Sequence, residues 1–251
     1  ILSLFALACA EKLLLTKLVY GTMGAFMPEP VQLASGYLHS AVTILFLLLV
    51  ARDALLLLTW PFRRSTGRQR KIFYGHKEKK PASGFWAFTL VLLALALSGY
   101  GMREALRVPP VREVRMQVPG LPDALNGFRI AQLSDLHIGP TFGKAWLTDV
   151  VARTDSLNPD LIVITGDVVD GSPSRLEEDV APLADLKAKY GVIFAPGNHE
   201  YYSGIQQWLP VFQRLGMHVL MNENTQIRVN GTPLAIAGVT DTAALNWGLE
   251  G

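Results

Sequence analysis

An uncharged segment at residues 84–102 constrains this chain more than any other feature of its sequence. Its 19 residues, GFWAFTLVLLALALSGYGM, contain no acidic or basic side chain. As a helix, such a segment is long enough to cross the hydrocarbon core of a membrane, which is roughly 30 Å thick. The composition agrees, because half of the residues are hydrophobic and the mean hydropathy is +0.26. The sequence therefore predicts a membrane-embedded part.

Two more apolar stretches precede this segment. Residues 38–60 are long enough for a second span, but they contain Arg52 and Asp53, and charges inside a membrane are costly. The pair is expected to be mutually neutralised, to face a neighbouring helix or to lie at the interface. We favour the interface, because residues 33–50 alone are 18 uncharged residues. Residues 1–20 contain three charges and predict either a span or an amphipathic helix on the membrane surface.

The loops between these stretches predict an orientation. Residues 61–83 contain eight Lys and Arg and one Glu, whereas residues 21–37 contain no Lys or Arg. Basic loops stay in the cytoplasm, so the chain after residue 102 is expected on the extracytoplasmic side of the cell (inner or cytoplasmic) membrane. A basic anchor next to the membrane explains residues 61–83 better than a nucleic-acid site does, and no nucleic-acid partner is expected.

The charge is divided between the two halves of the chain. Residues 1–108 contain 13 Lys and Arg and 5 Asp and Glu, a net charge of +8, whereas residues 109–251 contain 10 and 16, a net charge of −6. The sequence thus predicts a membrane region over 1–108 with two to three transmembrane helices, a Pro- and Gly-rich linker over 109–125, and a separate domain over 126–251.

Strand and helix patterns alternate after the linker. Buried strands are expected at residues 128–133, 161–165, 192–195 and 217–221. Helical spacing follows the first three, with Ser174 expected to cap the second helix and Pro182 expected to kink it. Asn230-Gly231 between two short apolar runs is typical of a β-hairpin. This order favours an α/β domain with an antiparallel element near its end.

A polar cluster directly follows each of the first three strands. Asp135 precedes Asp167 by 32 residues, and Asp167 precedes Asn198 by 31. Carboxyl ends of parallel strands open onto one crevice, so these side chains are expected to converge there. The converging residues are Asp135, His137, Asp167, Asp170, Asn198 and His199. Each cluster alone is typical of a turn or a cap, but three in order favour a site for Mn, Fe or Zn, because oxygen and imidazole donors suit these ions.

These clusters resemble the motif series of the calcineurin-like metallophosphoesterase superfamily. The motifs stand here as Asp135-Leu136-His137, Gly166-Asp167-Val168-Val169-Asp170 and Gly197-Asn198-His199-Glu200. The surrounding segments SDLHIGP, PDLIVITGDVVDG and GVIFAPGNHEYYSG are similar to the membrane-attached or exported bacterial branch. Over residues 126–241 the resemblance implies an αββα sandwich with two divalent metal ions.

The resemblance also implies roles for the site residues. Asp135 and His137 would bind the first metal ion, Asp167 would bridge both ions, and Asn198 would bind the second. His199 would face the leaving group as a catalytic residue, and Asp170 would orient His199. The implied reaction is hydrolysis of a phosphodiester, phosphomonoester or pyrophosphate by a hydroxide that the two ions share.

Substrate and partners follow less directly from the sequence. The membrane segments favour a phosphorylated small molecule or lipid, such as a lipid-linked or cell-envelope substrate, and contact with membrane lipids. A Ser/Thr protein phosphatase is disfavoured, because Gly171 follows Asp170 where that branch has Arg-Gly. Tyr201, Tyr202 and Trp208 could line a substrate subsite, although core packing is at least as good an explanation for Trp208. The oligomeric state is not predicted.

The histidines beyond the third motif depart from the family pattern. The superfamily's Gly-His and Gly-His-x-His motifs do not occur before Gly251, and His218 is the last histidine. His218 falls in a predicted strand, where a core or edge position is expected. We expect a C-terminally truncated domain. The alternative is a membrane-anchored binding or scaffold protein with an incomplete, inactive metal site.

Overall fold

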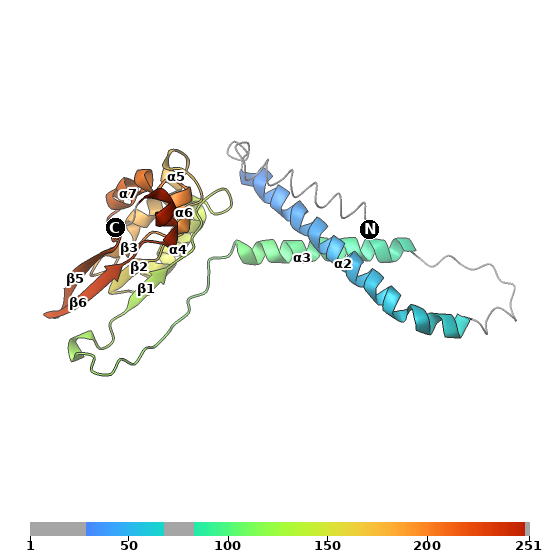
Figure 1. Cartoon of the computed structure of the whole chain (residues 1–251), viewed down its shortest axis with the longest axis horizontal. Coiled ribbons are helices and arrows are strands. Elements are labelled where there is room, and N and C mark those ends of the chain that lie inside the picture. Colours follow the sequence, from blue (N-terminus) through green and yellow to red (C-terminus); the bar gives the residue numbers. More distant parts are fainter. Residues whose placement is uncertain (1–28, 68–82, 249–251) are drawn as a thin grey trace. The chain divides into compact units, whose positions relative to one another are not determined.

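The computed structural model of this chain describes residues 29–67 and 83–248. Contacts divide the chain into two units, Ile1–Arg107 and Val108–Gly251. Figure 1 shows helices in the first unit, and both helices and strands in the second.

The first unit contains the helices α2 (Glu29–Gly67) and α3 (Ser83–Ala105). Within them, Pro30–Thr59 and Gly84–Ala105 are long and apolar enough to cross a membrane. The two helices contact each other, and the Ser98 hydroxyl on α3 donates a hydrogen bond to the Tyr37 carbonyl on α2 at 2.8 Å. The predicted helices over 38–60 and 84–102 are therefore confirmed, and their insertion in a membrane stays a prediction.

The charged pair inside α2 neutralises itself. Arg52 Nε donates to Asp53 Oδ1 at 2.7 Å, and both residues lie within the candidate span Pro30–Thr59. Mutual pairing was one of the three arrangements expected for these charges, and it lowers their cost near the membrane. The apolar stretch 1–20 lies outside the described residues, as does most of the basic loop 61–83.

The second unit is built on a four-stranded parallel sheet. Its strands are β1 (Ile130–Leu133), β2 (Leu161–Ile164), β3 (Val192–Phe194) and β4 (Met217–Val219), in the spatial order β1-β2-β3-β4. The helices that follow are α4 (Lys144–Asp155), α5 (Pro173–Val180), α6 (Asn198–Tyr202) and α7 (Ile205–Arg214). Short 3₁₀ turns lie at Asp123–Leu125, Ala181–Asp185 and Thr242–Trp247. The predicted strand and helix alternation is confirmed.

Alternate residues of the central strands face two different sets of neighbours. Ile162, Ile164 and Phe194 are at most 1% exposed and pack in one cluster with apolar side chains from α4, α5 and α7. Leu161 and Ile193 point to the opposite face, where they pack with Ile236. This alternation is the two-residue period of a strand that is buried on both faces.

Ile236 belongs to the antiparallel hairpin formed by β5 (Glu223–Val229) and β6 (Thr232–Gly238). Asn230 and Gly231 join the strands with φ angles of 50° and 87°, which confirms the predicted Asn-Gly turn. In the described part of the second unit, this hairpin is the only strand pair on that face. The αββα sandwich that the resemblance implies therefore stays a prediction.

Two expectations for the second helix differ from the structure. The Ser174 cap is wrong: α5 begins at Pro173, with Ser172 as the N-cap residue. Proline suits the first helical position, because its φ angle is already helical and its missing N–H has no partner there. Pro182 does not kink the helix as expected: α5 ends at Val180, and Pro182 lies in the 3₁₀ turn that follows.

Candidate metal centre

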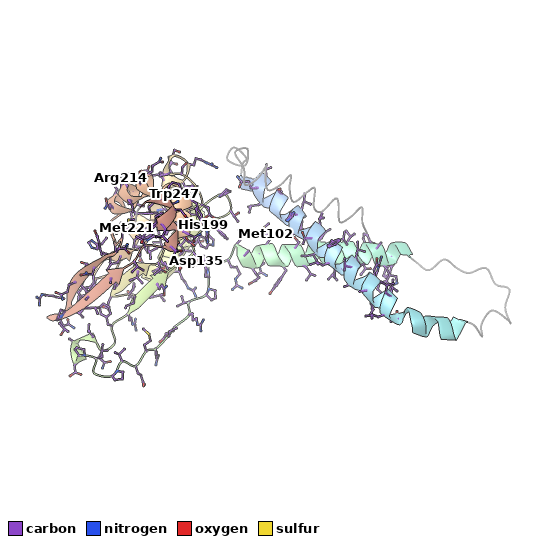
Figure 2. The ribbon with its side chains drawn as sticks, viewed as in Figure 1. Met102, Asp135, His199, Arg214, Met221 and Trp247 are labelled. Atoms are coloured by element: carbon purple, nitrogen blue, oxygen red, sulfur yellow. The ribbon has the colours of Figure 1, made fainter. Side chains whose placement is uncertain are left out.

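The three polar clusters lie together at the carboxyl edge of the parallel sheet. The segments that follow β1 and β2 stay hydrogen-bonded beyond the last paired residues of the strands. The Asp135 N–H donates to the Gly166 carbonyl at 3.2 Å, and the His137 N–H donates to the Asp167 carbonyl at 3.0 Å. Figure 2 labels Asp135, from the loop after β1, and His199, from the first turn of α6 after β3. The parallel topology thus produces the expected convergence.

Potential ligand atoms form two overlapping groups. Asp135, His137 and Asp167 offer atoms that lie within 4.8 Å of one another, and so do His137, Asp170 and His199. His137 belongs to both groups. All members are carboxylate oxygens or imidazole nitrogens, which are the donors that borderline and hard divalent cations prefer.

The Asn198 side-chain amide lies against the Asp167 carboxylate. With its nitrogen turned toward Asp167, the amide donates to Oδ1 at 3.3 Å and to Oδ2 at 3.2 Å, and its oxygen is left for another partner. In the opposite orientation the amide oxygen would face the carboxylate, an arrangement that a bound cation would stabilise. Carboxylate, imidazole and amide donors together fit a divalent metal ion.

Asp170 contacts both histidines of the site. Its Oδ1 lies 2.6 Å from His199 Nδ1 and 3.0 Å from His137 Nδ1. The two rings meet edge to face with their centroids 4.4 Å apart. When each Nδ1–H donates to Asp170, both Nε2 atoms are left for other partners. The sequence predicted the contact with His199, but not the one with His137.

The carboxylates around His137 favour its charged form. Burial alone would lower the pKa of His137, but the hydrogen bond with Asp170 and the negative charges of Asp170, Asp167 and Asp135 outweigh it. The pKa of His137 is therefore raised above its ordinary value of 6.5. The negative charges that favour a proton on His137 also favour a bound cation at this site.

Two glycines allow the loops after β2 and β3 to touch. A Cβ atom on Gly166 would collide with the Gly197 backbone, and a Cβ atom on Gly197 would collide with the Asp167 side chain. Gly166 also has a φ angle of 79°, which favours glycine. These positions bring the Asp167 and Asn198 side chains close together.

Glu200 is a site residue to which the sequence reasoning gave no role. It is fully buried, and its carboxylate accepts hydrogen bonds from four backbone N–H groups, those of Asp167, Val168, Val169 and Gly197. Burial raises the pKa of Glu200, and the N–H groups of Gly197, Val168 and Asp167 oppose part of this rise. Its place directly after Asn198 and His199 in the third motif was the available signal.

The remaining aromatic and histidine candidates separate by burial. Trp208 is fully buried, and its Nε1 donates to the Gly171 carbonyl at 2.8 Å, so it belongs to the core. Tyr201 is also fully buried, whereas Tyr202 is 65% exposed, with its ring 5.7 Å from that of His199. Of the three, only Tyr202 is placed to contact a substrate. His218 lies exposed on the edge strand β4, away from the clusters.

A comparison with protein families agrees with this geometry. Residues 128–244 match the family described as calcineurin-like phosphoesterase. This range contains all three polar clusters, the parallel sheet and the β5–β6 hairpin.

Similar proteins come from animals and bacteria. A protein of Danio rerio named transmembrane protein with metallophosphoesterase domain is 36% identical over 173 residues, which cover 66% of this chain and 40% of that protein. Its namesake in Bos taurus is 37% identical over 161 residues, covering 61% and 36%. An uncharacterized metallophosphoesterase of Campylobacter jejuni is 32% identical over 162 residues, covering 64% and 41%. No solved structure gives a significant match.

The matches cover only part of each relative, and one of them extends beyond the second unit of this chain. The chain spans about two fifths of the length of these three relatives. Since 66% of the chain is more than residues 108–251 provide, the similarity to the Danio rerio protein extends into the unit that contains α2 and α3.

Proposed function

We propose that the protein is a membrane-associated, metal-dependent hydrolase of phosphoester or phosphoanhydride bonds, because residues 128–244 match the calcineurin-like phosphoesterase family. The observation that carries the proposal is the convergence of acid, amide and imidazole groups from three loops at one edge of the sheet. The relatives in Danio rerio and Bos taurus are both named transmembrane protein with metallophosphoesterase domain, and this supports the membrane association.

The metal ligands in this proposal are Asp135, His137, Asp167 and Asn198, with Asp167 shared by two ions. When bound, divalent ions supply an activated water and neutralise the phosphoryl oxygens. Mn, Fe and Zn all suit the donor set. The like charges of Asp135 and Asp167 near one another also favour cation binding.

In this proposal, His199 gives the leaving group its proton, and Asp170 orients His199. Asp170 accepts the Nδ1–H of His199, so His199 Nε2 is directed away from Asp170. When the ring carries a second proton on Nε2, it passes that proton to the leaving oxygen and keeps the Nδ1–H that Asp170 holds. The same carboxylate oxygen accepts the Nδ1–H of His137, which leaves His137 Nε2 free for a metal ion. Asp170 thereby fixes the tautomers of both rings.

The substrate and its location are part of the proposal. We place the site on the extracytoplasmic side of the cell membrane, from the charge difference between residues 61–83 and 21–37. A phosphorylated lipid or another headgroup-level phosphate compound is the substrate class that a membrane-attached site reaches. A reporter fused after Ala105 tests the side, since a periplasmically active reporter should give signal and a cytoplasmic one should not.

Asp167→Asn tests the reaction. In the full-length protein, we expect this variant to abolish metal-dependent hydrolysis of a chromogenic phosphodiester or phosphomonoester while the protein stays folded, because the amide removes the shared charge. Glu177→Gln is the matched control: it also removes one negative charge, but from an exposed ion pair with Arg214, and should leave activity unchanged. Full activity of Asp167→Asn would contradict the assignment. A wild-type protein that binds metal without hydrolysis would favour the binding or scaffold alternative.

A further inference from the structure

The turn after β2 is held by a carboxylate that comes from another loop. The N–H groups of Asp167, Val168 and Val169 donate to Glu200 at 2.9, 2.7 and 3.3 Å. Gly197 donates to the same carboxylate at 2.8 Å. Successive N–H groups around a left-handed residue form a concave anion site. Here a side chain of the protein itself supplies the anion.

This contact connects the second motif to the third. Asp167 has a φ angle of 54°, a conformation that side chains other than glycine rarely adopt. Its N–H donates to Glu200, and its Oδ1 accepts the N–H of His199 at 2.9 Å. The Asp167 residue is therefore fixed from both ends by α6, the helix that also carries Asn198.

We propose that Glu200 is a positioning residue of the metal centre: its carboxylate holds the Asp167 turn in the conformation that brings the Asp167 side chain opposite Asn198, and so sets the affinity for metal. The inference rests on the proposed function, since it concerns the same ions. Glu200 is not itself a ligand, because four N–H donors occupy its two oxygens and no part of the residue is exposed.

Glu200→Gln isolates this role, because it keeps the size of the side chain. One oxygen remains, and the new NH₂ group faces two backbone N–H donors in either orientation. Asp160→Asn is the matched control. Asp160 also accepts a backbone N–H, that of Arg129 at 2.8 Å, but it joins the starts of β1 and β2 at the opposite edge of the sheet.

The experiment uses the purified full-length protein and has three readouts. Hydrogen exchange of the metal-free protein reports on the amides of residues 167–169, calorimetric titration with Mn²⁺ reports on affinity, and thermal unfolding reports on overall stability. For Glu200→Gln we expect faster exchange at residues 167–169 and Mn²⁺ affinity at least tenfold weaker, at a temperature where the variant is fully folded. Saturating Mn²⁺ should restore hydrolysis. Asp160→Asn should bind Mn²⁺ like the wild type.

Two results would overturn the inference: wild-type Mn²⁺ affinity in Glu200→Gln, or an equal loss of affinity in Asp160→Asn, which would indicate a general effect of stability. If Glu200→Gln does not fold, Glu200→Asp carries the test. Its carboxylate keeps the charge but is too short to reach all four donors, so Mn²⁺ affinity should fall several-fold, and unchanged affinity would overturn the inference. A wild-type protein that binds no Mn²⁺ would instead contradict the proposed function.

Discussion

The two edges of the parallel sheet use the left-handed backbone in different ways. Within the described residues, three of the non-glycine positions with positive φ are asparagines, such as Asn158 at the amino edge. The other three are Asp135, His137 and Asp167, all at the carboxyl edge. Short polar side chains such as those of Asn and Asp tolerate this conformation better than most, because they bond locally. The Asn158 side chain donates such a local hydrogen bond to the Ser156 carbonyl, whereas Asp135, His137 and Asp167 offer their side chains to a candidate metal site.

The carboxyl edge therefore needs contacts that hold its backbone in place. A left-handed residue costs about 1–2 kcal/mol, and a hydrogen bond to a charged group contributes about 1.5–3 kcal/mol. The Glu200 carboxylate accepts four such bonds, and those from the Asp167–Val169 turn oppose the conformational cost at Asp167. Asp160 at the amino edge receives one from Arg129. A strained conformation that nearby contacts over-determine is typical of a functional site.

The largest expected effect is a difference in stability between two glycine substitutions, one at each edge of the sheet. Gly166 and Gly191 have φ angles of 79° and 83°, but a Cβ atom on Gly191 meets nothing within 4 Å, whereas one on Gly166 meets the Gly197 backbone. Gly191→Ala should therefore lose about 1–2 kcal/mol of unfolding free energy. Gly166→Ala should lose at least about 3 kcal/mol, because overpacking adds to the conformational cost.

Denaturant unfolding of the metal-free full-length protein measures both variants. Equal losses would show that the contact between the loops after β2 and β3 does not constrain the site, and the contrast between the two edges would fail.

A smaller effect is expected when the Asp135 carboxylate is replaced by an amide. Asp135→Asn keeps a residue type that tolerates φ 56° and removes one of two neighbouring negative charges. The unfolding temperature of the metal-free protein should stay the same or rise. Calorimetry should show Mn²⁺ affinity at least tenfold weaker, since a charged ligand is lost. Such a trade between stability and function is common at binding sites.

Asn158→Asp is the reciprocal variant at the amino edge, at φ 49°. It should leave Mn²⁺ affinity at the wild-type value. If Asp135→Asn instead unfolds the domain, the carboxylate has a structural role that the contacts of the described residues do not reveal.

Much of the carboxyl edge could be predicted from the sequence, because period and order determine it. Apolar runs before Asp135, Asp167 and Asn198 predict parallel strands, and parallel strands end at one edge. The Asn230-Gly231 turn is equally local, since its residue types alone favour the required φ angles.

The rest depends on how loops contact each other, which no periodic pattern contains. Helix α6 begins at Asn198, inside a segment that the sequence predicts only as a polar cluster. The carboxylate of Glu200 finds three of its four donors about 30 residues earlier in the chain, and Asp170 reaches His137 across a separation of 33 residues. Such contacts depend on the loop conformations, and the loop conformations depend on the same contacts. Neither can therefore be predicted from the local sequence alone.

The smallest effect concerns the proton that His137 binds when no metal is present. Because the pKa of His137 is raised above 6.5 in the folded protein, folding favours the protonated ring. The resulting stabilisation is fully present below pH 6.5 and is lost as the pH rises through the folded pKa. Unfolding free energies measured in chelator across this window should therefore fall more steeply for the wild type than for His137→Gln. With saturating Mn²⁺, the unfolding free energy should instead rise with pH, because a metal ion binds the neutral ring and competes with the proton. A slope unaffected by Mn²⁺ would separate His137 from the metal centre.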